Sequence, residues 1–326
     1  MKIYFPQEDK YLDDEFKYLS VVNTNMTSDI ALRLSNERMI AVTDEQVSTY
    51  FDEANIASKL AVKGKYVALI SGRGGTTKEM IEEWKSFRLG NFTEEMENLT
   101  KIFHEIYKKT WIGDVLKKED LDDEEYKTGV LKNGKPIATY LLRKKQSETD
   151  EFVRSDSSRP GPKFNSYVIF AGHDEKRNDM EIYEIKGAGT HELVPDRFCA
   201  EGSGSIKART EIIDFIESLP PEKRDDIDFG EGLHVSMRAL VKSQKAPGVG
   251  GAHPAVAFIE KDSVRKLDSK KSAVMRNVVF KELKGEIEEN KAKSYLESLA
   301  NDKIDTLSVA KEIYKPEDLE KYGLYT

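Results

Sequence analysis

Runs of alternating apolar and polar residues open the patterned part of the chain and predict β-strands. In the first run Ile30, Leu32 and Leu34 fall on one face, and the polar segment 35–38 that follows suits a hairpin turn. A second strand pair follows, with Lys63-Gly64 between its members. The four predicted strands cover residues 30–34, 39–44, 56–62 and 65–70.

Helical spacing replaces this alternation after the fourth strand. The glycine-rich segment 71–75 ends the strand pattern, and Thr76 or Thr77 can cap a helix that extends to Phe87. A second amphipathic helix is predicted over 92–110. Its apolar face consists of Met96, Leu99, Ile102, Phe103 and Ile106.

A charged segment, 111–165, separates these helices from the next ordered elements. It is rich in Lys, Glu, Asp and Ser and ends in Pro and Gly, which predicts an insertion with a short strand at 137–142 and a flexible end. The last 60 or so residues look helical and charged. Between the insertion and this C-terminal region we predict strands at 167–170, 180–185 and 255–259 and helices at 205–219 and 231–243. Strands alternating with paired helices indicate an α+β protein with helix-covered sheets.

Composition and charge narrow the classes of protein. The 326 residues suffice for one large domain with an insertion, or for two domains. The net charge of -8 argues against general nucleic-acid binding, which needs a basic face. The single cysteine, Cys199, excludes an internal disulfide framework and fits a reducing cytoplasm. No apolar run reaches the ~20 residues of a membrane span, and the five histidines show no metal-ligand spacing. We therefore expect a cytoplasmic protein without membrane or nucleic-acid partners, cofactor or metal.

Several short blocks, taken in order, carry a family resemblance. The segment 27–34 resembles the first strand of proteasome-type (20S β-like) subunits, which belong to the N-terminal-nucleophile (Ntn) hydrolase superfamily, and Asp44 and Lys59 stand where that family has an aspartate and a lysine. The resemblance covers 27–261 and implies a four-layer αββα sandwich that carries the insertion at about 111–165. Outside it lie an N-terminal arm or leader, 1–26, and a helical C-terminal extension, 262–326. The other matching blocks are 71–72, 168–174, 181–185, 201–205 and 250–251.

The resemblance also implies a chemistry, that of a threonine peptidase or amidohydrolase. Thr27 would be the nucleophile, and its free α-amine, with a pKa of about 7.7–8.0, would be the base. Lys59 would lower the pKa of the hydroxyl, and Asp44 would orient Lys59. The N–H of Gly72 would receive the oxyanion, and Ser203 would hydrogen-bond near the amine.

The nucleophile position has two candidates. Sixteen positions separate Ser28 from Asp44, which suits the family spacing, whereas the phase of the first strand favours Thr27. A hairpin turn longer by one residue reconciles the two. Exposure of Thr27 requires removal of what precedes it, for example by translation from Met26 and trimming of the methionine.

Alternatives to a peptidase remain open. Retention of residues 1–26 would give a catalytically silent subunit for assembly or partner binding. The aspartate and serine that active relatives carry before the paired glycines are replaced here by Ala246 and Val249, or by the neighbouring Pro247 and Gly248, which favours the same alternative. A third alternative is a peptide-ligating acyltransferase with the same nucleophile. In the active case the partners are a peptide or protein substrate and further copies of the chain, for which the family suggests a ring.

Overall fold

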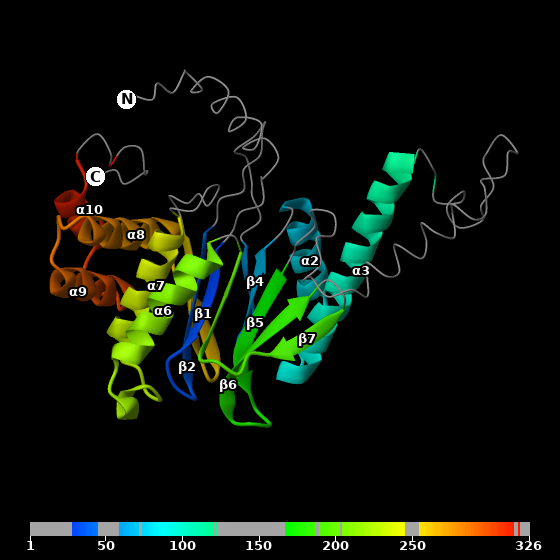
Figure 1. Cartoon of the computed structure of the whole chain (residues 1–326), viewed down its shortest axis with the longest axis horizontal. Helices are drawn as coiled ribbons and strands as arrows, with labels where there is room; N and C mark the ends of the chain where they lie inside the picture. Colours follow the sequence, from blue (N-terminus) through cyan, green and yellow to red (C-terminus); the bar gives the residue numbers. More distant parts are fainter. Residues whose placement is uncertain are drawn as a thin grey trace, which may run out of the picture.

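The computed structural model describes residues 28–44, 59–71, 74–119, 122, 167–186, 189–202, 204–244, 254–315 and 319. These residues form an α+β fold in which two antiparallel five-stranded sheets lie next to each other, with helices on their outer sides (Figure 1). Among the described helices, none is both long and apolar enough to cross a membrane.

The first sheet, sheet A, has the strand order β10-β9-β2-β1-β8. The predicted hairpin β1–β2 is confirmed, and its register runs from Asp29 opposite Thr43 to Arg33 opposite Met39. In the hairpin turn the N–H of Glu37 donates to Ser35 Oγ at 3.2 Å. The strands of sheet A are β1 (Asp29–Arg33), β2 (Arg38–Asp44), β8 (Phe198–Glu201), β9 (Pro254–Glu260) and β10 (Ser263–Lys266).

The second sheet, sheet B, has the order β3-β4-β5-β6-β7. Its first turn uses Gly64, whose φ of 61° lies in the left-handed region that glycine adopts without steric cost. The turn predicted at Lys63-Gly64 between the two strands is therefore confirmed. The strands of sheet B are β3 (Leu60–Lys63), β4 (Tyr66–Ser71), β5 (Tyr167–Asp174), β6 (Asp179–Lys186) and β7 (Thr190–Leu193).

Helices cover each sheet on the side that faces away from the other sheet. Aspartates cap three of them: Asp228, Asp268 and Asp305 accept hydrogen bonds from backbone N–H groups of the first turn. Sheet B carries α2 (Gly74–Ser86) and α3 (Phe92–Glu119), and the side of sheet A carries α6 (Ser205–Ser218), α7 (Phe229–Ser243), α8 (Ser269–Leu283), α9 (Glu289–Ala300) and α10 (Thr306–Ile313), with a 3₁₀ turn, η1, at Pro221–Lys223.

Three hydrophobic clusters hold these elements together, and strand alternation decides which residue enters which cluster. Ala31 of β1 packs between the sheets, together with Leu69 and Ile169 of sheet B. Ile30 and Leu32, on the other face of β1, pack against the helices of sheet A. The third cluster lies between sheet B and α2–α3 and includes Trp84, Phe103 and Phe170. Odd positions of β1 therefore face sheet B, and even positions face the helices.

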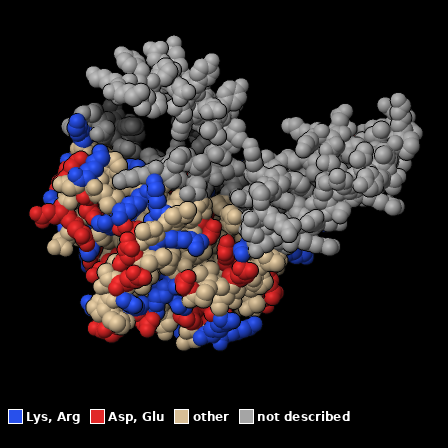
Figure 2. Space-filling model, in the orientation of Figure 1, with Lys and Arg blue, Asp and Glu red and all other residues tan. Residues whose placement is uncertain are grey.

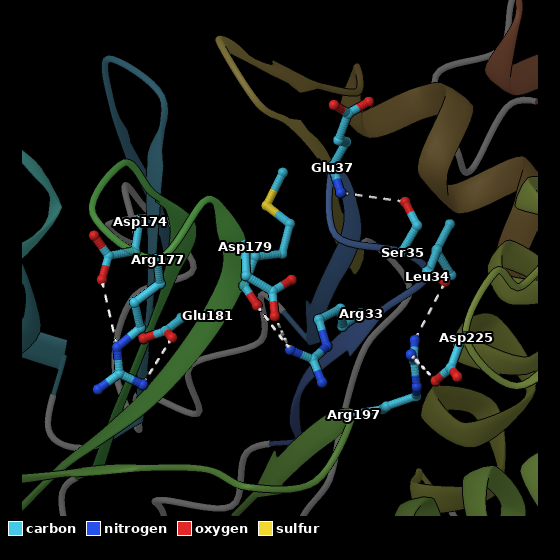
Figure 3. Close-up of polar contacts among 11 residues, drawn as sticks. Arg33, Leu34, Ser35, Glu37, Asp174, Arg177, Asp179, Glu181, Arg197 and Asp225 are labelled. Atoms are coloured by element: carbon cyan, nitrogen blue, oxygen red, sulfur yellow. Dashed lines mark hydrogen bonds and ion pairs between the residues drawn. The ribbon is translucent and has the colours of Figure 1, made fainter.

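Polar contacts at one end of the sheets join β1 to sheet B and the start of β8 to the helix layer of sheet A (Figure 3). Arg33, the last residue of β1, donates from Nη1 to Asp179 Oδ2 at 2.9 Å and to the carbonyl oxygen of Met180 at 3.2 Å. Arg197 Nη2 donates to Asp225 Oδ1 at 2.5 Å. These contacts tie β1 to the hairpin β5–β6, and the start of β8 to the segment before α7.

The structure departs from the predicted boundaries in two places. Helix α3 continues to Glu119, so the predicted start of the insertion at 111 falls inside a helix; its Lys- and Glu-rich sequence suits a helix as well as a loop. Strand β10 lies in the region predicted to be a helical extension, because it pairs with β9 across a two-residue turn. The predicted strand at 137–142 and the arm 1–26 lie outside the described residues.

Two helix glycines differ in the space around them. A Cβ on Gly232 of α7 would collide with Leu34 Cδ2, whereas nothing lies within 4 Å of a Cβ on Gly113 of α3. We expect Gly232→Ala to lower the free energy of unfolding by about 1–3 kcal/mol through overpacking. Gly113→Ala is expected to raise it by about 0.5–1 kcal/mol through helix propensity. Urea titrations of the two variants test this, and a stabilising Gly232→Ala would contradict the packing of α7 on β1.

Candidate active site

A buried ion pair connects the two sheets at the end opposite to Arg33. Lys59 directly precedes β3 of sheet B, and Asp44 ends β2 of sheet A. Lys59 Nζ lies 3.4 Å from Asp44 Oδ1, and the two side chains are 4% and 0% exposed. The backbone of Lys59 is fixed as well, because its carbonyl oxygen accepts from the N–H of Ile70 at 2.9 Å. The structure thus brings together two of the residues that the sequence predicted for the site.

The same Asp44 oxygen holds the start of β1. The backbone N–H of Ser28 donates to Asp44 Oδ1 at 2.8 Å, and the N–H of Asp44 donates to the Ser28 carbonyl at 3.3 Å. Asp44 therefore holds Ser28, the residue before β1, on the same carboxylate oxygen that contacts the Lys59 ammonium.

The Ser28 side chain lies on the helix side of sheet A. A Cβ built on Gly204, just before α6, would collide with Ser28 Oγ and would come within 2.6 Å of Ser243 Cβ at the end of α7. Ser28 Oγ is buried and has no hydrogen-bond partner among the described residues. Its position agrees with the alternation of β1, in which even-numbered residues face the helices.

A second buried acid, Asp29, occupies the other face of β1 and is 1% exposed. Its Oδ1 lies 2.5 Å from Thr43 Oγ1, and the Thr43 hydroxyl is also 3.2 Å from the Asp44 carbonyl oxygen. In the described part of the chain, the second oxygens of Asp29 and Asp44 have no hydrogen-bond partner. The site therefore holds two buried carboxyls and the Lys59 ammonium.

Burial sets the electrostatics of this group. Burial raises the pKa of Asp29 to about 7, against the opposing effects of the Lys59 charge and the Thr43 hydroxyl. Burial likewise raises the pKa of Asp44 to about 6, against the Lys59 charge and the Ser28 N–H. Among the described residues, Asp44 receives donors from the Ser28 N–H and the Lys59 ammonium, whereas Asp29 contacts only the Thr43 hydroxyl. When one of the two carboxyls is ionised, it is therefore Asp44.

The other predicted site residues, Thr27, Gly72 and Ser203, lie outside the described residues. The neighbouring strands have their ends on the Lys59–Asp44 side of the sheets. At the start of β1, Asp29 pairs with Thr43 of β2 and with Glu201, the last residue of β8. Strand β4 ends at Ser71, directly before Gly72. Sequence reasoning missed Asp29 and Thr43. The alternation of the first strand could have indicated Asp29, because Asp29 lies on the same face as Ala31. An acid on that face is expected to be buried between the sheets.

Other described features do not extend the site. Among the described residues, no group of three His, Cys, Asp or Glu side chains could hold a metal ion. A surface pocket of about 340 Å³ lies on α3 and the β6–β7 connection, away from Lys59. Its lining residues are Glu97, Thr100, Lys101, His104, Gly189 and His191. On the face that Figure 2 shows, acidic and basic side chains are interspersed.

Comparisons with known proteins do not assign the chain to a family. No protein-family model matches the sequence, and no curated protein matches it either. The fold and the Lys59–Asp44 arrangement are therefore the ground for a functional conclusion.

Proposed function

We propose that the chain is an Ntn hydrolase of the proteasome type that cleaves amide bonds, with Thr27 as nucleophile and base. The observation that carries the proposal is the buried Lys59–Asp44 pair. Asp44 Oδ1, which contacts Lys59 Nζ, also accepts from the N–H of Ser28, the residue after Thr27. A cation, an orienting carboxylate and the start of a strand are the parts that such a site requires.

The arrangement of the layers supports the fold part of this proposal. Two five-stranded antiparallel sheets pack through one hydrophobic cluster, and each packs through another on its own helices. This is the order expected of a four-layer αββα sandwich. The segments 1–26 and 262–326 would then be additions to a domain over 27–261.

Two features favour Thr27 over Ser28 as the nucleophile. First, alternation along β1 assigns odd positions to the inter-sheet face, which Asp29 and Ala31 occupy, whereas Ser28 lies against Gly204. Second, a free amine on Ser28 would sit on the Asp44 carboxylate, which would hold it protonated and unable to act as a base. Asp44 in this proposal orders Ser28 so that Thr27 can meet Lys59.

The proposed reaction has two steps, acylation of Thr27 and hydrolysis of the resulting ester. The Thr27 hydroxyl adds to the substrate carbonyl carbon while its proton passes to the Thr27 amine, and the amine returns that proton to the leaving nitrogen as the C–N bond breaks. Water then hydrolyses the Thr27 ester, again with the amine as base. Lys59 stabilises the forming alkoxide, and the N–H of Gly72 and the hydroxyl of Ser203 are assigned to the oxyanion and the amine.

The proposed activity implies a class of substrate, an assembly and a cellular location. The substrate would be a peptide or protein, and the resemblance implies an assembly of identical subunits, for which a ring is one form. A cytoplasmic location fits the single cysteine, Cys199, which is a free and buried thiol.

Two other functions use the same fold. A silent subunit is favoured by Ala246 and Val249, or the neighbouring Pro247 and Gly248, which stand where active members of the family carry polar groups near the amine. An acyltransferase would return the acyl group to an added amine instead of water. Product analysis with a peptide and an added amine distinguishes transfer from hydrolysis.

A pair of adjacent variants tests the nucleophile. In native protein that begins at Thr27, we expect a threonine-directed peptide electrophile to add one adduct, located on residue 27 by mass spectrometry. Thr27→Ala should abolish labelling, because the hydroxyl that forms the adduct is lost. Ser28→Ala is the matched control and should retain it. A native mass that includes residues 1–26, or labelling that survives Thr27→Ala, would overturn the assignment.

A further inference from the structure

Asp29 is a buried acid at the proposed site that the reaction does not use. It lies on the inter-sheet face of β1, its carboxyl is within electrostatic reach of Lys59, and it is 1% exposed. A buried carboxylate whose second oxygen lacks a partner is costly unless the group carries a proton or another donor reaches it. Its protonation state therefore matters to the charge of the whole site.

The contacts of the Thr43 hydroxyl indicate where a proton belongs. Thr43 Oγ1 lies between two oxygens, Asp29 Oδ1 at 2.5 Å and the Asp44 carbonyl at 3.2 Å, and a hydroxyl has one hydrogen to donate. If Asp29 is ionised, Thr43 can satisfy only one of them. If Asp29 is protonated, it donates to Thr43 Oγ1, Thr43 donates to the Asp44 carbonyl, and both contacts are hydrogen bonds.

Two neighbouring carboxylates also favour a proton on Asp29, whereas the Lys59 charge opposes it. Asp44 of β2 and Glu201 of β8 each disfavour a second negative charge, and Lys59 is already bound to Asp44. Glu201 is in turn bound to Arg209 of α6, at 2.5 Å. In the described part of the chain, the remaining titratable or charged groups near this face are Cys199, Glu184 and Lys186.

We propose that Asp29 is a positioning residue that holds a proton at the Lys59 site, so that it adds no second negative charge beside the Lys59–Asp44 pair. This rests on the proposed function of Thr27. When pH rises, the proton leaves Asp29 for the solvent, and the new carboxylate offsets the positive charge of Lys59. The hydroxyl of Thr27 then loses the field that lowers its pKa, and the rate falls on the alkaline side.

The test uses Asp29→Asn, a mimic of the protonated acid, in native protein that begins at Thr27. We expect the variant to react with the threonine-directed electrophile about fivefold to tenfold faster than the wild type at about pH 8.5, and equally fast near about pH 6. Identical pH profiles of the two proteins would overturn the proposal. Absence of labelling in both proteins at every pH would instead refute the nucleophile, which is a different result.

A second readout does not depend on activity. Because the folded-state pKa of Asp29 lies above its unfolded value, Asp29 lowers wild-type stability progressively as pH rises from about 4 to about 7. Asp29→Asn should remove that loss, so its melting temperature should exceed the wild type's by about 3 °C or more above about pH 7. Infrared difference spectra should show a protonated carboxyl near neutral pH in the wild type that is lost in Asp29→Asn.

The neighbouring acid supplies the control. Glu201→Gln removes a carboxylate opposite Asp29 in the sheet without touching Thr43, and it should keep the infrared band of the protonated acid. A wild-type spectrum without such a band, or a band that remains in Asp29→Asn, would show that Asp29 holds no proton.

Discussion

Lys59→Met is expected to slow the reaction of Thr27 with an electrophile or a peptide by about 10²–10⁴-fold. The Lys59 ammonium is the cation that the structure brings to the start of β1 through Asp44, and methionine fills a similar volume without the charge. The hydroxyl would return towards its ordinary pKa, and the amine would no longer be kept neutral. Rates measured with saturating electrophile, on protein that begins at Thr27, test the prediction.

The same substitution also affects folding, so a second variant is needed. Removing Lys59 leaves Asp44 fully buried without its ammonium, a change that costs about 3–5 kcal/mol in comparable pairs. Lys59→Met with Asp44→Asn removes both charges and should recover much of that stability while the reaction stays slow. The amide can still accept the Ser28 N–H, so the start of β1 keeps its place.

The control for Lys59 is Lys78→Met on α2, where the lysine is exposed and weakly paired with Glu82 at 3.8 Å. It should leave rate and stability nearly unchanged. If the stable double variant reacted at the wild-type rate, Lys59 would have no part in the chemistry.

Hydrophobic alternation was enough to predict the central strands. Ile30 and Leu32 on one face of β1, with Ala31 on the other, follow directly from period-two patterning, and the structure has the same faces. The pairing of Asp44 with Lys59 came from the family resemblance, because no local pattern relates two residues fifteen positions apart in different sheets.

The rest depends on partners that are distant in sequence. Strand β10 exists because β9 offers it an edge, and nothing in 263–266 alone distinguishes it from a helix start. Asp29 acquires its significance from Thr43 and Glu201, which flank it in the sheet only after β1 has paired on both sides. Single-sequence patterns record what a residue prefers locally, and these features are set by tertiary contacts.

A second buried charge fixes the strand that follows Lys59. Glu95 of α3 is 0% exposed and accepts three hydrogen bonds: from Lys63 Nζ at 2.7 Å, from Trp84 Nε1 at 2.8 Å and from the N–H of Gly90 at 2.7 Å. Lys63 also lies over the Trp84 ring, 5.6 Å from its centroid. One carboxylate therefore joins the end of β3 to α2, α3 and the loop between them.

We expect Glu95→Ala to lower the free energy of unfolding by about 3–5 kcal/mol, because it leaves the Lys63 ammonium and the Trp84 indole N–H buried without an acceptor. Glu95→Gln should lose less, since an amide oxygen still accepts one or two of the three bonds. Glu97→Ala, an exposed position on the same helix, is the control and should change stability by less than about 0.5 kcal/mol. Urea unfolding followed by Trp fluorescence measures all three. A loss in Glu95→Ala no larger than in Glu97→Ala would show that β3, and with it Lys59, is held by apolar packing alone.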